Sequence, residues 1–374
     1  MALAYNKENA LNAICPYFTM FPLEYPTKVL KKHRRERPVV FDPFCGRGTT
    51  LFAARNFELR AWGIDSSPVA VSIAKAKLAC CDANVPLEMA ARLIAETDPQ
   101  EIPESNFFRT AYHARTLRDI CALREALLQL EVETDASVIL RAATLGCLHG
   151  PLPKNTENAG YFSNQMPRTY ASKPDYAVRY WKERGSKAPR IDVLRVLRRK
   201  IERLTGLANK SPNCFSQVVH GDAQSGDVFQ TIGAAPSIVI TSPPYYGMRT
   251  YVQDQWLRNW FLGGPDHVDY SAGPQLDHGG KDAFARSLGT VWRNVGGLAS
   301  STESLHMYVR FGIIPSAAVN AKEIFRNSLE ESGINWRLVS VRAADSADAG
   351  KRQADQMKAD SAAAVEFDFH VERI

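Results

Sequence analysis

The chain has 374 residues, of which 45% are hydrophobic and 23% charged, and its net charge is +6 at pH 7. This length exceeds what one hydrophobic core usually holds, so we expect one large domain with an insertion, or two domains. The sequence contains no run of eighteen apolar residues and no basic-then-apolar leader, so we expect neither a membrane span nor a signal peptide. Its seven cysteines form no Cys-x-x-Cys pair, so we expect a reducing, cytoplasmic compartment and no metal site.

Aromatic side chains are frequent ahead of the first predicted strand. Tyr17, Phe18, Thr19 and Phe21 lie in this segment, and a basic helix is expected from Thr27 onward to residue 37. Packing of this helix onto a sheet is one role for the aromatic side chains, because large apolar rings dominate cores.

The apolar run at residues 39–41 predicts the first strand, and a helix is expected to begin near Thr49. Gly46 and Gly48, between them, permit positive φ and a close approach of the backbone to a ligand. The free amides at the start of the helix favour a negatively charged group. Leu51 occupies the third glycine position of the dinucleotide fingerprint, which disfavours NAD.

A second strand is predicted over residues 59–65. It ends at Asp65, nineteen residues after Gly46, where an acid can bind both hydroxyls of a ribose. Two serines and a proline follow, which is typical of a helix start. We expect Ser66 to cap the helix over residues 69–78.

Residues 82–214 interrupt the alternation of strands and helices. Leu, Ala and Arg recur at helical spacing over residues 111–148, and a looser polar run follows over 150–168. Residues 171–210 hold twelve basic and four acidic side chains, so this segment carries +8 and the rest of the chain −2. Such a block indicates either a polyanion site or a solvated helix face. The last helix expected here, over residues 191–204, carries Arg195, Arg198, Arg199 and Arg203.

The sheet is expected to resume with a strand over residues 215–223 that ends in Gly-Asp-Ala. A further apolar strand, over residues 237–240, runs into Thr-Ser-Pro-Pro-Tyr at residues 241–245. Two consecutive prolines cannot continue a ladder, so the chain leaves the sheet there in an extended conformation. A stiff loop with a hydroxyl, fixed carbonyls and the rings of Tyr245 and Tyr246 suits the binding of a flat polar ring, through hydrogen bonds and stacking. The alternative is a Pro-Pro turn beside two core tyrosines.

The C-terminal part predicts a second group of alternating elements. Trp256 and Trp260 are four residues apart on an expected helix and are predicted to pack in a core. Strands are expected over residues 305–315, 336–342 and 365–371, and a helix over 321–331. The last strand alternates apolar and polar residues, which is typical of an edge or antiparallel strand.

Two of these stretches together resemble the DNA amino-methyltransferases that modify N4 of cytosine or N6 of adenine. Residues 42–50, Asp-Pro-Phe-Cys-Gly-Arg-Gly-Thr-Thr, resemble the cofactor motif of that family, and residues 241–245 resemble its catalytic motif. The resemblance covers residues 15–80 and 215–374.

The resemblance implies an α/β fold, namely the Rossmann-like fold of methyltransferases that depend on S-adenosylmethionine (AdoMet). We expect a mostly parallel seven-stranded sheet with an antiparallel last strand, formed by a catalytic domain of residues 1–81 and 215–374. The mainly helical insertion, residues 82–214, is then the candidate target-recognition region.

The resemblance also implies roles for individual residues. AdoMet is the expected cofactor, and the residues implied to bind it are Phe18, Thr19, Asp42, Pro43, Phe44, Gly46, Gly48, Thr49, Thr50, Asp65, Ser66, Asp222 and Ala223. The expected catalytic residues are Ser242, Pro243, Pro244 and Tyr245. The expected contacts with DNA are Tyr246, Arg249, Arg168, Arg195, Arg198 and Arg199.

Ser242 favours N4 of cytosine as the target, because serine is commoner there in the cytosine enzymes of the family and Asp or Asn in the adenine enzymes. Double-stranded DNA is the expected partner, and a restriction or phage-defence partner is compatible with the resemblance. Three alternatives stay open: an N6-adenine enzyme, an RNA amino-methyltransferase and a catalytically silent DNA-binding subunit. The intact motifs disfavour the silent subunit, and the RNA enzyme is disfavoured because no separate N-terminal RNA-binding domain is recognised.

Overall fold

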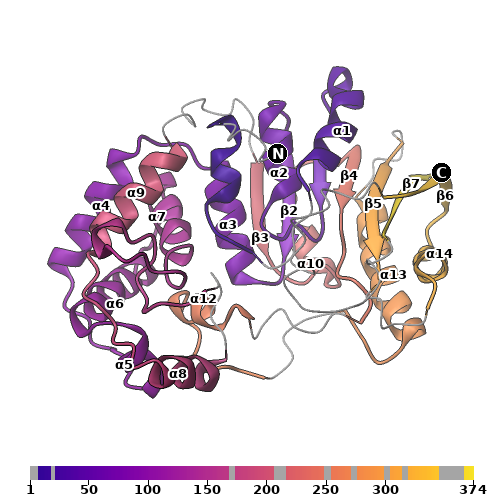
Figure 1. Cartoon of the computed structure of the whole chain (residues 1–374). Helices are drawn as coiled ribbons and strands as arrows, with labels where there is room; N and C mark the ends of the chain where they lie inside the picture. The colour runs from indigo at the N-terminus through magenta and orange to yellow at the C-terminus, as the bar shows by residue number, and fades with distance from the viewer. Residues whose placement is uncertain are drawn as a thin grey trace. The chain divides into compact units, whose positions relative to one another are not determined.

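A computed structural model of the chain describes residues 7–17, 22–167, 173–205, 216–247, 254–270, 276–298, 304–313, 319–344 and 366–374. The chain divides into two compact units (Figure 1). Unit 1 comprises Met1–Tyr17, Lys75–Ser211 and Thr250–Ser271, and unit 2 comprises Phe18–Ala74, Pro212–Arg249 and Ala272–Ile374. Unit 1 thus contains most of the predicted insertion together with residues 1–17 and 250–271. The predicted domain limits at residues 82 and 214 stay a prediction.

Unit 2 is built on a seven-stranded sheet. Its strands are β1 (Val40–Asp42), β2 (Ala61–Asp65), β3 (Ser216–His220), β4 (Ile238–Thr241), β5 (His306–Gly312), β6 (Trp336–Ala343) and β7 (Glu366–Arg373). They lie in the order β3-β2-β1-β4-β5-β7-β6, and β7 runs antiparallel to both its neighbours while the other pairs are parallel. This topology confirms the predicted α/β methyltransferase fold with its antiparallel last strand.

The helices of unit 2 are α1 (Glu24–His33), α2 (Thr49–Asn56), α10 (Gly226–Phe229), α13 (Lys281–Gly297) and α14 (Ala321–Glu331), with the short 3-10 helix η2 (Arg34–Glu36); α3 (Pro68–Leu78) begins in this unit. Phe41, Val239 and Met307 are register partners on β1, β4 and β5, so their side chains share one face. The hydrophobic core joins this face to Trp292 of α13 and Phe325 of α14, all fully buried. Burial of one such side chain stabilises the fold by roughly 2–3 kcal/mol.

The helix α1 begins earlier than the sequence predicted. The expected start was Thr27 and the expected end residue 37, whereas α1 spans Glu24–His33. Pro26 fits inside the first turn because the first N–H groups of a helix need no partner within it. Arg37, with a left-handed φ of 46°, ends the segment after η2.

Unit 1 contains the α-helices α4 (Asn84–Glu96), α5 (Asn106–Ala111), α6 (Ala114–Leu128), α7 (Asp135–Leu145), α8 (Pro174–Glu183), α9 (Val193–Thr205) and α12 (Trp256–Phe261), with the 3-10 helices η1 (Lys7–Ala13) and η3 (Thr156–Asn158). The helix α12 packs on α5: the ring centroids of Phe108 and Trp260 are 4.6 Å apart, and those of Phe107 and Trp256 are 4.8 Å apart. Both tryptophans are 3% exposed, which confirms the prediction that they pack in a core.

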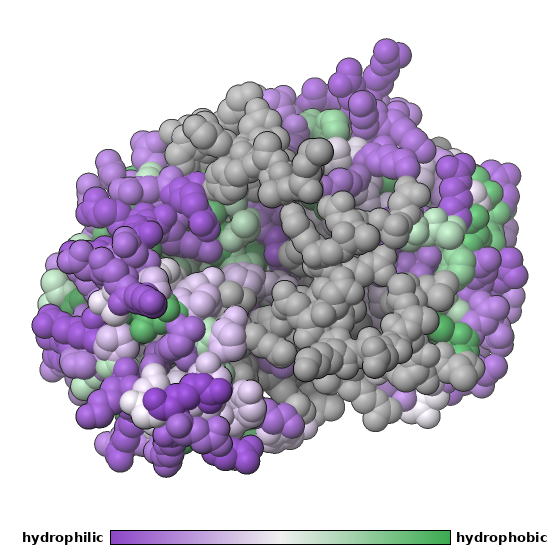
Figure 2. All heavy atoms as spheres, in the orientation of Figure 1, coloured by the Kyte–Doolittle hydropathy of each residue, from purple (hydrophilic) through white to green (hydrophobic). Residues whose placement is uncertain are grey.

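The surface of unit 1 that Figure 2 shows, at the left of the view, is mainly hydrophilic. The helix α9 explains part of this pattern, because it buries Leu197 and Ile201 and exposes its arginines on the opposite side. Among the residues that the structure describes, no helix combines the length and the apolar character that a bilayer crossing requires.

Candidate active site

The two recognised motifs follow neighbouring parallel strands, β1 and β4. The chain continues from β1 to β2 on one side, whereas β4 lies on the other, so this is the switch point of the sheet. In open α/β sheets, ligands bind at the carboxyl ends of the strands at such a point. The Thr241 hydroxyl donates a hydrogen bond of 2.6 Å to Oδ1 of Asp42, and the Thr50 hydroxyl donates one of 3.1 Å to the carbonyl of Ile240. These bonds join the motif after β1 to the motif at the end of β4.

Asp42 is an ionisable group in an almost dry environment, with 2% of its surface exposed. Burial raises the pKa of its carboxyl from 3.8 to about 6, because a low-dielectric surrounding disfavours the charged form. The Thr241 and Thr50 hydroxyls and the amide of Phe44 oppose this increase, and the nearby charge of Asp65 adds to it. The turn therefore contains a buried carboxylate whose ionised form is stabilised by its hydrogen-bond donors.

The turn after β1 needs two glycines for different reasons. Both Gly46 and Gly48 have left-handed φ values, 50° and 73°. A Cβ atom on Gly48 would lie 2.7 Å from the Cβ of Ala74, so a side chain there would collide with α3. A Cβ on Gly46 would come no nearer than 4.0 Å to the carbonyl oxygen of Phe44, so Gly46 borders open space. The turn is therefore packed on one side and accessible at Gly46.

Asp65, the last residue of β2, contacts the same turn. Its Oδ2 accepts a hydrogen bond of 2.8 Å from the Gly46 amide, and its Oδ1 accepts one of 2.8 Å from the Ser67 amide. Burial raises the pKa of the Asp65 carboxyl, while these two amides lower it. An ionised carboxylate has about four acceptor positions, so Asp65 retains capacity for the hydroxyls of a ligand.

The cap of α3 is Ser67 and not Ser66, so this part of the prediction was wrong. The Ser67 hydroxyl accepts a hydrogen bond of 3.3 Å from the amide of Ala70. Pro68 is the first residue of α3, which leaves the N-cap position to the residue directly before it. Ser66 lies half-buried beside Asp65, and its contact with a cofactor stays a prediction.

Asp222 and Ala223 lie in the loop that follows β3. The Asp222 Oδ1 accepts a hydrogen bond of 2.9 Å from the amide of Gln224. The Asn294 side chain on α13 donates to the carbonyls of Ala223 and Gln224 at 3.1 and 3.2 Å. Ala223 is buried and Asp222 half-buried, so the loop is fixed to α13 with one carboxylate at its tip.

The loop after β4 contains the four predicted catalytic residues. Pro243 is buried, whereas Ser242 and Tyr245 are half-buried. Tyr246 pairs with Ile313, just beyond β5, which extends the parallel pairing of β4 and β5 along the loop. This second pairing holds the loop against the sheet although its prolines prevent a regular strand.

The Tyr245 phenol belongs to a polar group that the sequence did not predict. Burial raises the pKa of Tyr245 well above its ordinary value, and the Glu366 carboxylate of β7 adds to the increase. The Ser242 hydroxyl acts in the opposite direction. Tyr245 therefore stays neutral and can donate a hydrogen bond. Glu366 lies more than a hundred residues away in the sequence and had no signal there, whereas Thr241 was part of the motif but was given no role.

The neighbouring Tyr246 packs among aromatic side chains. Its ring is stacked with that of His278 at 6.3 Å and meets Phe284 edge-on at 5.4 Å. The amide of Gly247 donates to Nδ1 of His278 at 3.3 Å. The ring of Tyr246 is therefore anchored to α13 and to the residues just before it.

Four predicted site residues lie outside the described residues: Phe18, Thr19, Arg168 and Arg249. Three others, Arg195, Arg198 and Arg199, are exposed on α9 in unit 1. Each has a partner there: Glu157 is 3.8 Å from Arg195, Glu202 is 3.7 Å from Arg198, and Asn158 is 3.2 Å from Arg199. Exposed pairs of this kind contribute about 0–1 kcal/mol, so phosphates can compete for these arginines.

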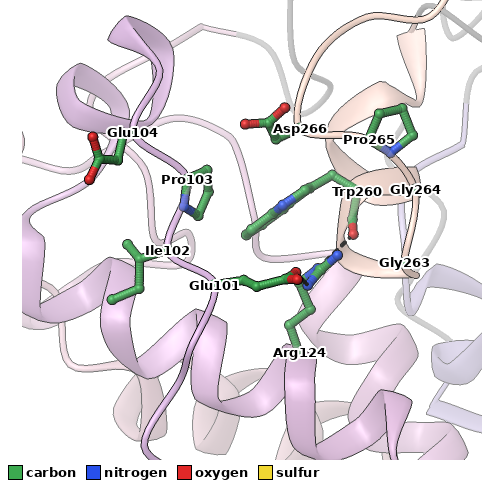
Figure 3. A pocket seen from close by; sticks show the side chains of 10 residues that line it. All are labelled: Glu101, Ile102, Pro103, Glu104, Arg124, Trp260, Gly263, Gly264, Pro265 and Asp266. Atoms are coloured by element: carbon green, nitrogen blue, oxygen red, sulfur yellow. Dashed lines mark hydrogen bonds and ion pairs between the residues drawn. The ribbon is translucent and has the colours of Figure 1, made fainter.

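A cavity of about 460 Å³ lies within unit 1, and its lining is acidic (Figure 3). Glu101, Glu104 and Asp266 contribute carboxylates, and one cation, Arg124, lies 3.6 Å from Glu101 and donates to the carbonyl of Trp260 at 2.9 Å. Carboxylates repel phosphates, so this cavity does not suit a nucleic-acid backbone, and it contains none of the predicted site residues.

One family of known proteins matches part of the chain. A family model described as DNA methylase matches residues 2–76, which include the turn after β1. No curated protein sequence matches the chain.

The chain is also similar to solved methyltransferase structures. The rRNA methyltransferase aviRa from Streptomyces viridochromogenes has 13% identity and a TM-score of 0.35, covering 100% of this chain and 93% of that one. A SAM-dependent methyltransferase from Agrobacterium tumefaciens has 9% identity and a TM-score of 0.32, covering 95% and 62%. Magnesium protoporphyrin IX methyltransferase from Synechocystis PCC 6803, solved with bound SAM, has 7% identity and a TM-score of 0.31, covering 100% of both chains.

The strand order, with its antiparallel last strand, is that of the AdoMet-dependent methyltransferase fold, and the turn after β1 lies within the residues that the DNA methylase model matches. The resemblance to the DNA amino-methyltransferases is confirmed over residues 2–76, where the DNA methylase model matches.

Proposed function

We propose that this methyltransferase modifies an exocyclic amine of a base in double-stranded DNA, with N4 of cytosine as the preferred target. The observation that carries the proposal is the hydrogen bond between Thr241 and Asp42. It fastens the end of β4, from which the Ser-Pro-Pro-Tyr loop starts, to the glycine turn after β1. A cofactor in the turn and a base in the loop would therefore meet over two adjacent strands. The DNA methylase match over residues 2–76 supports a DNA substrate.

The described residues fit AdoMet. The open side of Gly46 admits the amino-acid end of the cofactor, and Asp65 suits the ribose hydroxyls. Asp222 and Ala223 suit the adenine, and Phe18 and Thr19, which lie outside the described residues, are proposed to contact the cofactor. Asp42 and Asp65 have pKa values raised by burial, so a cationic ligand beside them would relieve the unfavourable desolvation of two carboxylates. AdoMet carries such a charge on its sulfonium.

AdoMet supplies an electrophilic methyl group, and the residues of the loop would prepare the amine. An aromatic amine is a weak nucleophile because the ring shares its lone pair. The Ser242 hydroxyl and the Pro243 carbonyl would each accept one N–H of the amine and draw the nitrogen toward a tetrahedral form. Its lone pair would then point to the turn after β1, and positioning would supply most of the rate. The proton released from the amine passes to solvent.

The base has to leave the duplex to reach this loop. Tyr245 offers a ring face for stacking, and its neutral hydroxyl can donate to the flipped base or to the Glu366 carboxylate. Tyr246, anchored by His278 and Phe284, would form the wall of the base pocket. The arginines at positions 168, 195, 198, 199 and 249 are proposed to contact the DNA. Ser242, in place of Asp or Asn, is the reason for preferring cytosine.

Transfer of labelled methyl groups by the purified protein tests this proposal. The expected result is label in unmodified double-stranded DNA, recovered as N4-methylcytosine, and no label in RNA. Ser242→Ala should reduce transfer strongly while AdoMet affinity stays within about twofold, since Ser242 is assigned to the base. Ser105→Ala, at an exposed serine in unit 1, is the matched control and should behave as wild type. Label in RNA alone, or loss of AdoMet binding in Ser242→Ala, would contradict the proposal.

A further inference from the structure

A second cluster of functional side chains lies on β5 and β7. In this antiparallel pair, which Figure 1 shows side by side, His306 is directly opposite Glu372, and Tyr308 is directly opposite His370. Directly opposed side chains point to the same face of a sheet, as do residues two positions apart. The four side chains therefore form one polar group on one face, and none of them has a part in the methyl transfer proposed above.

Three of these side chains present metal-ligating atoms to one another. His306 Nδ1 is 3.2 Å from His370 Nε2 and also 3.2 Å from Glu372 Oε1. All three ligand atoms lie within 4.8 Å of one another, and among the residues that the structure describes no other group of three His, Cys, Asp or Glu does so. Ligands at about 2.0–2.1 Å from a tetrahedral zinc ion are separated from one another by about 3.3–3.4 Å. The two 3.2 Å separations are therefore close to those of a filled zinc site.

Hydrogen bonding alone explains this arrangement poorly. Nδ1 of a neutral imidazole carries at most one proton, which can be donated to one acceptor. Here two atoms, Nε2 of His370 and Oε1 of Glu372, lie at the same distance from Nδ1 of His306. A metal ion between the three atoms would satisfy all of them at once.

The surrounding side chains hold the ligands in place. The Tyr308 ring is stacked on that of His370, with centroids 4.2 Å apart and an interplanar angle of 8°. The Tyr308 hydroxyl is hydrogen-bonded to Nε2 of His33, at the end of α1, at 2.8 Å. Arg337 of β6 binds Oε2 of Glu372, which leaves Oε1 directed at His306. Partners of this kind orient metal ligands and are a regular part of metal sites.

The cluster also has an entry path and a definite position in the fold. The side chains of His306 and Glu372 are 27% and 18% exposed, so an ion can reach them from solvent. His306 is the first residue of β5, whereas the loop that carries Ser242 follows the last residue of the parallel strand β4. The cluster therefore lies at the opposite end of the sheet from the candidate active site.

We propose that His306, His370 and Glu372 bind a divalent transition-metal ion of the zinc class, which ties β5 to β7 at the end of the sheet opposite the candidate active site. Two imidazoles and one carboxylate suit Zn²⁺, whereas Mg²⁺ prefers oxygen ligands alone. Three protein ligands would leave the fourth position of a tetrahedral ion to a water molecule.

Calorimetric titration of the untagged, chelator-treated protein with zinc chloride is the experiment. Wild type is expected to bind one zinc ion, and magnesium chloride is expected to give no heat. His370→Asn and Glu372→Gln should each weaken zinc binding by at least about tenfold, because loss of even an outer partner weakens metal sites by about 10–100-fold. His267→Asn, at an exposed histidine of unit 1, is the control and should leave the affinity unchanged.

Cysteines are the competing ligands, because Cys80 and Cys81 are adjacent and half-exposed. Cobalt in place of zinc separates the two cases: visible bands of a four-coordinate ion without a thiolate charge-transfer band are expected. A thiolate band, no zinc binding by wild type, or site variants that bind zinc as tightly as wild type would overturn the proposal. In the presence of chelator, each site variant should show a cooperative thermal unfolding transition, which shows that it is folded. Added zinc should raise the unfolding temperature of wild type only, and an equal rise in the variants would also count against it.

Discussion

The substitution Asp42→Asn should make the protein more stable at neutral pH while it impairs cofactor binding. Burial raises the pKa of Asp42 from 3.8 to about 6, so the folded state binds the proton more tightly than the unfolded state. The stabilisation from this proton is complete below the unfolded pKa and is lost as the pH rises through about 6. A shift of about two units corresponds to roughly 3 kcal/mol. The unfolding free energy of wild type should therefore fall by about that amount, relative to the variant, between pH 3 and pH 7.

Urea unfolding of both proteins at a series of pH values measures this difference, and other titrating groups largely cancel in the comparison. Thr241→Val supplies a second arm, because it removes the 2.6 Å hydrogen bond to the Asp42 carboxylate. A hydrogen bond to a charged group contributes about 1.5–3 kcal/mol, so the pKa of Asp42 should rise by a further 1–2 units, roughly. In the double variant the effect of Thr241→Val on the pH dependence should vanish. Parallel stability curves for wild type and Asp42→Asn would refute the reasoning.

Two further predictions concern the glycine turn and α9. Gly48→Ala should destabilise the protein more than Gly46→Ala in thermal unfolding, because both add left-handed strain of roughly 1–2 kcal/mol but only the first collides with α3. Gly46→Ala should instead lower the affinity for AdoMet in calorimetry. A greater loss of stability in Gly46→Ala than in Gly48→Ala would contradict the roles assigned to the two glycines of the turn. Replacing Arg195, Arg198 and Arg199 by Gln should weaken binding to duplex DNA and lower the slope of log affinity against log salt by about 0.9 for each phosphate that the variant no longer neutralises. An unchanged slope in a binding titration would move the DNA-binding surface away from α9.

The local features of the fold could be predicted from the sequence. Apolar runs of three to five residues gave β1, β2 and β4, and the glycine and proline motifs marked the loops at their ends. The helical character of residues 111–148 and the buried position of Trp260 followed from spacing alone. These features depend on neighbours within one or two turns of the chain.

The interactions that escaped prediction join residues far apart in the sequence. The Glu366 carboxylate comes to Tyr245 because β7 is inserted between β5 and β6, and this pairing depends on the packing of the whole sheet. The same insertion brings His370 to His306 across 64 residues. The start of α1 at Glu24 was also missed, because Pro26 was expected to lie before the helix although the first turn accepts it.

The most direct test of the central claim is nucleoside mass spectrometry of DNA from cells that express the wild type, beside cells that express Ser242→Ala. The account predicts N4-methylcytosine in the first sample and none in the second, because Ser242 is assigned to the reacting amine. N6-methyladenine in the first sample would leave the proposed mechanism unchanged but would show that the target base is adenine. The absence of any modified base from the DNA of both samples, with methylated RNA in the wild-type cells, would contradict the claim that this methyltransferase acts on DNA.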